Sequence, residues 1–230
     1  MRASSPTAAS RLSSPDLRAR GLPAPGVPER SASTPARLRP SARAPAVHPG
    51  TSTPVRLNVG CGPDPPDGWL NADRQPGPRV DLCGDIRDGL ALADDAVDCI
   101  AAIHFLQDLP WDAIDGALRE MRRVLKPGGV LRVAVPDLDR AIDAYRRGDA
   151  GYFFVPDVDA RSVGAKLVTQ IIWYGSVRTP FTFDFAREWL ENAGFRDVAR
   201  CAFGETRHGD AGIVALDNRE RESLFVEALK

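Results

Sequence analysis

Four places between residues 57 and 104 carry the residue types that a binding site for a small cofactor needs. An apolar run from Leu57 ends in Gly60-Cys61-Gly62, where missing Cβ atoms let backbone groups approach a ligand closely. Asp73, thirteen residues after Gly60, and Asp85 each supply a carboxylate that accepts hydrogen bonds. His104 is a residue type that exchanges protons near neutral pH. The spacing indicates a ligand site with an acid–base group beside it.

Each of these residues follows a candidate β-strand, which explains how they are brought together. Short apolar runs predict strands at Leu57–Val59, Trp69–Asp73, Arg79–Leu82, Val97–Ile103 and Val130–Val135. Apolar residues at helical spacing from Ile114 to Leu125 predict a crossover helix, which Pro127-Gly128 ends. Alternating strands and helices are typical of a parallel α/β sheet, in which ligands bind at the carboxyl ends of the strands.

The last third of the chain continues this pattern. Apolar positions from Phe185 to Ala193 predict a further helix, which Gly194 ends. Two strands are expected after it, at Val198–Phe203 and Ser223–Ala228. The whole of residues 55–230 has the length of one folded domain with a sizeable core.

From about Leu57 to Tyr145, these motifs resemble the class I S-adenosylmethionine-dependent methyltransferases. The resemblance rests on Asn58-x-Gly60-Cys61-Gly62, Gly68-Trp69-x-Asn71-x-Asp73 and Leu125-Lys126-Pro127-Gly128-Gly129. It implies a three-layer, Rossmann-like α/β sandwich with a seven-stranded, mostly parallel sheet. The last strand of such a sheet lies antiparallel between the fifth and sixth strands, and Ser223–Ala228 resembles it. The resemblance also implies a methyltransferase with S-adenosyl-L-methionine as its cofactor.

The resemblance assigns a role to each residue near the glycine turn. Gly60, Cys61 and Gly62 would pass under the methionine and ribose portions of the cofactor. Asp73 would accept hydrogen bonds from the two ribose hydroxyls, a task for which a carboxylate has paired acceptors. Asp85 would meet the adenine amino group, and Ile86 would cover the adenine ring. An ordinary turn is the alternative for the glycines, for Asp73 and above all for Asp85.

Other positions complete this cofactor shell or depart from the family pattern. Ile103, the last residue of the fourth strand, is expected to contact the cofactor. Asn58 stands where many of these enzymes place an acid that contacts the amino group of the cofactor. Asp64 stands where a third glycine is frequent. At both positions the chain lacks the residue that the family pattern has near the methionine end of the cofactor, so the resemblance is weaker there.

His104 is the expected catalytic residue, at the rim where the methyl group is transferred. Similar enzymes often read His-x-Leu-Glu-His here, whereas this chain has His104-Phe105-Leu106-Gln107-Asp108. Three roles stay open for His104: a general base, a contact to cofactor or substrate, and a structural histidine. His208 and Arg207, in the loop after the sixth strand, are second candidates for substrate contact.

Two connections are unusual for the fold. Only seven residues separate Gly62 from Leu70, and three of them are prolines, so the first helix is expected to be missing or reduced to a single turn. Residues 148–181, after the fifth strand, form a long insertion with many aromatic residues. We expect it to cover the site as a substrate lid, with packing at the base of a cap as the alternative role of its aromatic residues.

Residues 1–54 differ from the rest in composition. They hold ten of the twenty prolines, eight arginines and only two acids, and we expect a disordered tail. The remainder then carries a net charge of about −7, which disfavours nucleic acid as a partner. No uninterrupted apolar stretch is long enough to predict a membrane span. The oligomeric state stays open.

The cysteines bear on metal binding and location. Cys61, Cys83, Cys99 and Cys201 lie far apart, without the spacing of zinc ligands, so no metal is expected. Reduced, mostly buried thiols favour a cytoplasmic protein.

Three functions remain from the sequence. The first is methyl transfer to an oxygen, nitrogen or carbon of a small-molecule acceptor. The second is a non-catalytic binding or scaffold domain of the same fold, which the missing Glu and His after His104 suggest. The third, a nicotinamide-dependent oxidoreductase, is disfavoured because the absent first helix would hold the pyrophosphate.

Overall fold

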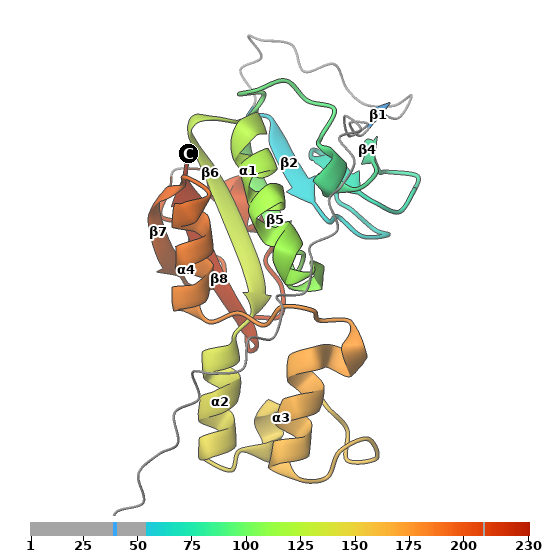
Figure 1. The fold of residues 1–230 in the computed structure, drawn as a ribbon, viewed down its shortest axis with the longest axis vertical. Helices are drawn as coiled ribbons and strands as arrows, with labels where there is room; N and C mark the ends of the chain where they lie inside the picture. The colour runs from blue at the N-terminus through green and yellow to red at the C-terminus, as the bar shows by residue number, and fades with distance from the viewer. Residues whose placement is uncertain (1–38, 41–53, 209) are drawn as a thin grey trace, which may run out of the picture. The chain divides into compact units, whose positions relative to one another are not determined.

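One eight-stranded sheet runs through residues 39–40, 54–208 and 210–230, the parts of the chain that the computed structural model describes. The strand order is β1-β4-β3-β2-β5-β6-β8-β7 (Figure 1). The bounds are β1 Arg39–Pro40, β2 Arg56–Val59, β3 Leu70–Asp73, β4 Leu82–Cys83, β5 Val97–Ile103, β6 Leu125–Pro136, β7 Arg196–Cys201 and β8 Ser223–Leu229. The expected disordered tail, except for Arg39, Pro40 and Pro54, lies outside the described residues.

The sheet has the topology that the family resemblance implies. Strands β4, β3, β2, β5 and β6 are mutually parallel, and β8 lies antiparallel between β6 and β7. The predicted antiparallel last strand is therefore confirmed. The short strand β1 pairs antiparallel with β4 and adds an edge that the sequence did not predict, while β4 is shorter than the strand expected at Arg79–Leu82.

Two amphipathic helices cover one face of the sheet, in front of it in Figure 1. They are α1 (Ile114–Val124), which follows a 3₁₀ turn at Trp111–Ala113, and α4 (Phe183–Asn192). In α1 the apolar residues at helical spacing, Ile114, Ala117, Leu118 and Met121, are fully buried. They join Leu57, Ile100, Leu131, Val133 and Val226 of the strands in one apolar cluster, so the predicted crossover helix is confirmed.

The opposite face has no α-helix over it in the described chain, because the connections that would supply helices are short. Residues 60–69 form turns only, as the prolines at 63, 65 and 66 predict, and the connection after β4 holds just the 3₁₀ helix η1 (Ile86–Asp88). Residues 202–222, with the 3₁₀ helix η6 (Ala211–Leu216), cover this face instead. The second layer of the sandwich is therefore mostly loop.

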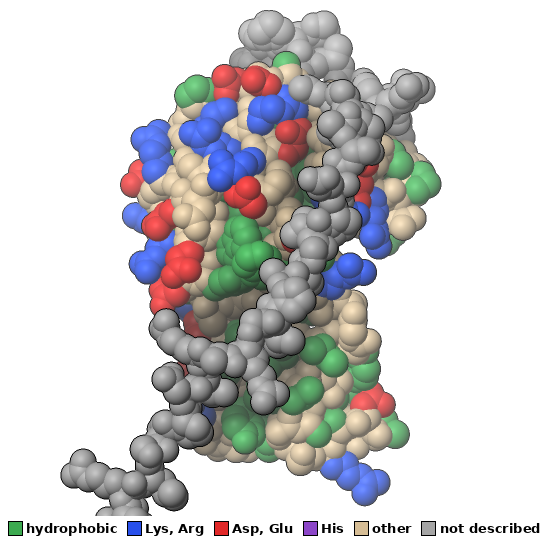
Figure 2. All heavy atoms as spheres, viewed as in Figure 1, with side chains coloured by type: hydrophobic (Ala, Val, Ile, Leu, Met, Phe, Trp, Pro, Cys, Tyr) green, Lys and Arg blue, Asp and Glu red, His purple; other side chains and the backbone are tan. Residues whose placement is uncertain are grey.

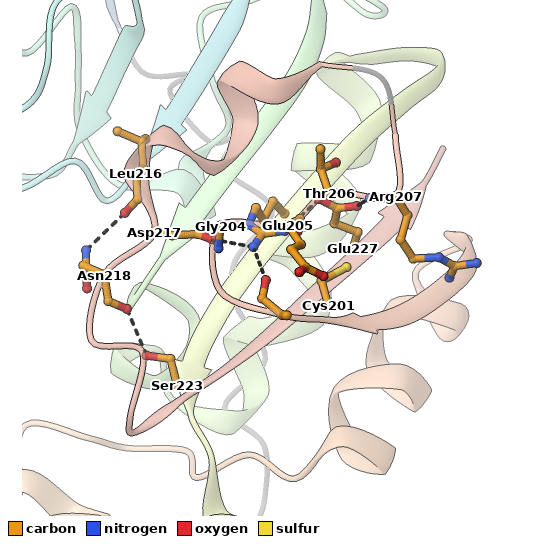
Figure 3. Close-up of polar contacts among 12 residues, drawn as sticks. Cys201, Gly204, Glu205, Thr206, Arg207, Leu216, Asp217, Asn218, Ser223 and Glu227 are labelled. Atoms are coloured by element: carbon orange, nitrogen blue, oxygen red, sulfur yellow. Dashed lines mark hydrogen bonds and ion pairs between the residues drawn. The ribbon is translucent and has the colours of Figure 1, made fainter.

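Arg132 of β6, which is completely buried, fixes residues 202–222 to the sheet. Its guanidinium donates to Asp217 at 2.6 and 2.5 Å and to Glu227 of β8 at 2.7 Å. The carbonyl oxygens of Glu205 and Ala202 accept the two remaining hydrogens, at 3.0 and 3.2 Å. All five guanidinium donors are thus satisfied. Figure 3 shows Asp217, Gly204, Glu205 and Glu227 drawn together at this place.

Residues 137–181 form a separate lobe beyond the carboxyl ends of the strands (Figure 1). It consists of α2 (Leu138–Arg146), η4 (Ala150–Tyr152), α3 (Val163–Ile172) and η5 (Trp173–Gly175). Its own small core contains Ala141, Ala144, Tyr152 and Phe153. Figure 2 shows mostly hydrophobic and few charged side chains over this lobe, whereas charges gather over α1 and α4. None of the described helices is long and apolar enough to cross a membrane.

Candidate functional site

A cavity of about 470 Å³ opens at the carboxyl ends of β2, β3, β4 and β5. This volume lies within the range of about 300–1,000 Å³ that is typical of small-molecule sites. Its wall brings together residues from the glycine turn, the two strand-end aspartates, the loop after β5 and the lobe: Val59, Gly60, Gly62, Ala72, Asp73, Arg74, Gly84, Asp85, Ile86, Arg87, Leu90, His104, Phe105, Asp108, Leu109, Pro110, Gly175, Ser176 and Arg178. Six of the predicted site residues are among them.

The glycine turn is fixed by its own hydrogen bonds. Gly60 and Cys61 both donate their N–H groups to the carbonyl of Ala72, at 2.8 and 3.2 Å. Gly60 and Gly62 have φ angles of +71° and +69°, a region that favours glycine. A Cβ on Gly60 would lie 2.5 Å from the ring of Phe105, whereas a Cβ on Gly62 would meet open space. The backbone N–H groups therefore hold the turn, and the missing side chains provide room for Phe105 and for a ligand.

Asp73 connects the turn to the end of β3. One carboxylate oxygen accepts the Gly62 N–H at 2.9 Å, and the other accepts the Gln75 N–H at 2.8 Å. Each oxygen has a further lone pair, and the side chain borders the cavity. The two backbone donors orient the carboxylate, so that it can accept two more hydrogen bonds side by side.

Asp85 borders the same cavity but is already engaged. Its side chain caps η1 by accepting the Arg87 N–H at 3.0 Å, and it forms a two-pronged ion pair with the Arg87 guanidinium at 2.9 and 2.5 Å. Hydrogen bonding to Arg87 lowers the pKa of the Asp85 carboxyl despite its partial burial. The turn chemistry noted in the sequence is therefore present at this position, next to Ile86, whose buried side chain also borders the cavity.

His104 follows β5 in a strained conformation, with φ of +53°. Its Nε2 lies 3.0 Å from the Ser223 hydroxyl, whose own hydrogen has an acceptor in the Arg219 carbonyl at 2.8 Å. These contacts fit the tautomer with the ring hydrogen on Nε2, in which Nδ1 keeps its lone pair. Nδ1 is buried and has no partner among the described residues. Burial, and secondarily the charge of Arg219, lowers the pKa of His104 to about 4, so the ring is neutral at physiological pH.

Three predicted cofactor residues are not on the cavity wall. Asn58 is 5% exposed, and its amide donates to Asn71 at 3.1 Å on the opposite side of the sheet from Leu57. The Cys61 thiol lies against the Gly62 carbonyl, and burial raises its pKa to about 12. Ile103 follows Ala102, which belongs to the apolar cluster under α1. Because side chains alternate along a strand, Asn58 and Ile103 face the other side.

The structure adds wall residues that the sequence reasoning missed. Phe105 packs against Gly60, and its position directly after His104 was the available signal. Asp108 has a pKa raised by burial, and Arg74 and Arg178 border the same cavity. The sequence distance of about 70 residues between Asp108 and Arg178 left no local pattern from which their proximity could be inferred. His208 and Arg207 lie elsewhere, on the face that residues 202–222 cover.

The donor and acceptor groups of the cavity fit S-adenosylmethionine. The oriented carboxylate of Asp73 suits a pair of ribose hydroxyls, and the open space in front of Gly62 admits the ligand chain. Ile86 and Leu90 supply the apolar wall that an adenine ring needs. A dinucleotide would lack its anchor, because the described chain has no helix after the glycine turn.

Comparison of the sequence with protein families also indicates a methyltransferase. Residues 57–133, about a third of the chain, match the family model described as "Methyltransferase domain". This segment contains the glycine turn, both strand-end aspartates and His104. A search of curated proteins finds no match.

Solved structures with the same fold are distant in sequence. One is an S-adenosylmethionine-dependent methyltransferase from Archaeoglobus fulgidus, 14% identical, with a TM-score of 0.50 over 78% of this chain and 87% of that one. Another, from Thermotoga maritima, is described as a possible histamine N-methyltransferase; it is 17% identical, with a TM-score of 0.46 over 78% of this chain and 84% of that one. At these identities the likeness concerns the fold alone. The family match thus identifies residues 57–133 as similar to a methyltransferase domain, and the fold is shared with S-adenosylmethionine-dependent methyltransferases.

Proposed function

We propose that this methyltransferase acts on a small-molecule acceptor, whose oxygen, nitrogen or carbon nucleophile enters the cavity between the glycine turn and the lobe. The observation that carries the proposal is the shared wall of one concave site, to which Gly62, Asp73, His104 and Ser176 all contribute. A concave site of this size suits a metabolite better than a macromolecular surface. Residues 148–181 contribute Gly175, Ser176 and Arg178 to that wall, which supports the lid expected from the sequence.

The residues of the chain contribute mainly by binding and alignment. Asp73 and the turn at Gly60–Gly62 hold the ribose and methionine portions, with Asp85 and Ile86 at the adenine end. Bound S-adenosylmethionine supplies an electrophilic methyl group on a sulfonium. The wall from His104 to Arg178 holds the acceptor in line with that methyl group, so that alignment provides much of the rate enhancement.

His104 is our candidate for the group that receives the acceptor's proton. Its neutral ring and unpartnered Nδ1 support this role. Since Nδ1 is buried, the proposal includes a movement of the His104 or Phe105 ring that exposes this atom to the acceptor. A carbon nucleophile or a neutral amine can react without such a base. A structural role through Ser223 is the alternative.

Calorimetric titration with S-adenosylhomocysteine tests the cofactor site. Asp73→Ala removes charge-assisted hydrogen bonds worth about 1.5–3 kcal/mol each, so the affinity is expected to fall about ten- to a hundredfold. Asp64→Ala is the matched control, because the Asp64 side chain is 93% exposed and lies off the cavity wall. Equal affinities of the two variants for S-adenosylhomocysteine would show that Asp73 does not bind the cofactor.

Methyl transfer to a panel of metabolites tests the reaction and the base together. His104→Ala is expected to keep its affinity for S-adenosylhomocysteine and to lose about 10²–10⁴-fold in single-turnover rate on an oxygen nucleophile. A near-normal rate of methyl transfer would show that His104 is not the general base, while the methyltransferase assignment would stand. Cofactor binding without transfer to any compound would favour the scaffold alternative.

A further inference from the structure

The cavity wall carries arginines that have no partner in the part of the chain that the structure describes. Most arginines of the described chain are in ion pairs, including Arg87, which Asp85 holds. Arg74 and Arg178 have no carboxylate within ion-pairing distance among the described residues, and no side-chain hydrogen bond of theirs is found there. Both border the cavity and both are exposed. Unpaired guanidinium groups on the wall of a binding site are recognition groups for carboxylates and phosphates.

Asp108 also borders the cavity, and it does not pair with these arginines. Its carboxyl lies in the field of Arg219, Arg74 and Arg178, but it forms no ion pair with any of them. Burial raises its pKa, with these arginines opposing the change. The other two acids of the wall are engaged, since Asp85 is bound to Arg87 and Asp73 holds the glycine turn. The wall thus carries three carboxylates and three guanidinium groups, and of these guanidinium groups only Arg87 has an ion-pair partner among the described residues.

The backbone of Arg178 is firmly attached to the loop that carries His104. The N–H groups of Arg178 and Thr179 both donate to the Gln107 carbonyl, at 2.8 and 3.1 Å. The buried Thr179 hydroxyl donates to the Leu109 carbonyl at 2.9 Å, and the Gln107 amide donates to the His104 carbonyl at 2.6 Å. These hydrogen bonds fix the backbone of Arg178 relative to the His104 loop, while the Arg178 guanidinium has no partner among the described residues.

The chain reverses direction in a strained turn just before Arg178. Trp173 and Tyr174 have φ angles of +38° and +56°, which are unusual for aromatic residues, and Gly175 follows with +94°. The Tyr174 hydroxyl donates to Asp159 at 2.6 Å and helps to hold the turn. This reversal ends α3 and directs Gly175, Ser176 and Arg178 onto the cavity wall. Strain of this kind is retained where it positions functional groups.

We propose that the acceptor is an anionic small molecule, a carboxylate or a phosphate ester, whose charged group binds to Arg178 with Arg74 as a further positive charge. This inference rests on the proposed function and specifies its substrate class. The sulfonium of bound cofactor would bring a further positive charge into the cavity, which favours an anionic partner. The nucleophile would then lie at a fixed distance from the anchored anion, beside His104.

The test uses the full chain saturated with S-adenosylhomocysteine. Matched pairs of an acid and its neutral amide are titrated by calorimetry at constant ionic strength, for example benzoate with benzamide and phenylacetate with phenylacetamide, together with phenyl phosphate and phenol. We expect the anions to bind about ten- to a hundredfold more tightly than their neutral counterparts, as charge-assisted pairing predicts. Arg178→Gln should abolish this preference, and Arg178→Lys should keep part of it.

Arg147→Gln is the matched control, because Arg147 is an exposed arginine of the lobe that does not border the cavity. It should leave the anion preference unchanged. The proposal is overturned if no pair shows a preference for the anion, or if Arg178→Gln leaves the preference intact. It is also overturned if Arg178→Gln weakens S-adenosylhomocysteine instead, which would assign Arg178 to the cofactor carboxylate. Failure of the unmodified chain to bind S-adenosylhomocysteine would be seen first and would reject the proposed function itself.

Discussion

Different interactions hold the covering segments on the two faces of the sheet. Two neighbouring residues of β6 show the difference, because their side chains point to opposite faces. Leu131 is completely buried and belongs to the apolar cluster that α1 and α4 close. Arg132, the next residue, is equally buried but faces residues 202–222, where carboxylates and carbonyls surround it. Where crossover helices cover a sheet, apolar burial is sufficient. Where a loop covers it, attachment depends on a complete set of hydrogen bonds.

Arg132→Ala is expected to have the largest effect on stability. It leaves Asp217 and Glu227 buried without their cation, and removal of one partner from a buried ion pair costs about 3–5 kcal/mol. The free energy of unfolding from urea titration measures this loss. Replacing Arg132, Asp217 and Glu227 together by apolar residues of similar volume should cost much less. A loss below about 1 kcal/mol for Arg132→Ala would show that water reaches this face readily.

Leu131→Ala probes the apolar face at the adjacent position. A cavity in a well-packed core costs about 2–5 kcal/mol, so this loss is expected to be somewhat smaller than that of Arg132→Ala. Limited proteolysis distinguishes the faces. Arg132→Ala should make residues 202–222 the first site of cleavage under native conditions, whereas Leu131→Ala should not. Identical cleavage patterns in the two variants would contradict the separate roles of the faces.

Acid should destabilise the domain through His104, next to the end of residues 202–222. The ring is neutral in the folded protein, with a pKa of about 4, and it binds a proton near pH 6.5 in the unfolded chain. Stability from this residue is therefore complete above pH 6.5 and is lost as the pH falls from 6.5 to 4, by up to about 3 kcal/mol. His104→Asn should remove this part of the pH dependence in urea titrations. If the free energy of unfolding depended on pH in the same way in both proteins, the His104 ring would not be buried in its neutral form.

Arg56→Gln should have the smallest effect, although it also breaks an ion pair on the polar face. Arg56 pairs with Asp210 at 2.8 Å, but the two side chains are 26% and 29% exposed. Hydrogen bonding to Arg56 lowers the pKa of the Asp210 carboxyl, so the pair stabilises the fold above pH 4 and is lost below it. A loss of about 1 kcal/mol or less is expected at pH 7. A loss as large as that of Arg132→Ala would mean that exposure does not distinguish the two pairs.

The glycine turn and the strand-end aspartates of the cavity wall could be inferred from the sequence because their signals are local. The glycine turn, the strand-end aspartates and the prolines that exclude a first helix each act within a few residues, and the strands and helices α1 and α4 follow from the period of their apolar positions. These patterns were sufficient to indicate the family resemblance, and the resemblance in turn predicted the order of the strands. Asn58 and Ile103 were assigned to the cofactor by position, and the alternation of side chains directs them to the other face.

Only the tertiary structure decided what covers the second face of the sheet and which residues of the lobe border the cavity. Arg132 and Asp217 are 85 residues apart, and Arg178 reaches the His104 loop through the Gln107 carbonyl, about 70 residues away. A buried arginine has no periodic signature, because its stability depends on partners from distant segments. The amino-acid sequence therefore determined the glycine turn on the cavity wall, while long-range hydrogen bonding decided which charged residues of distant segments border the same cavity.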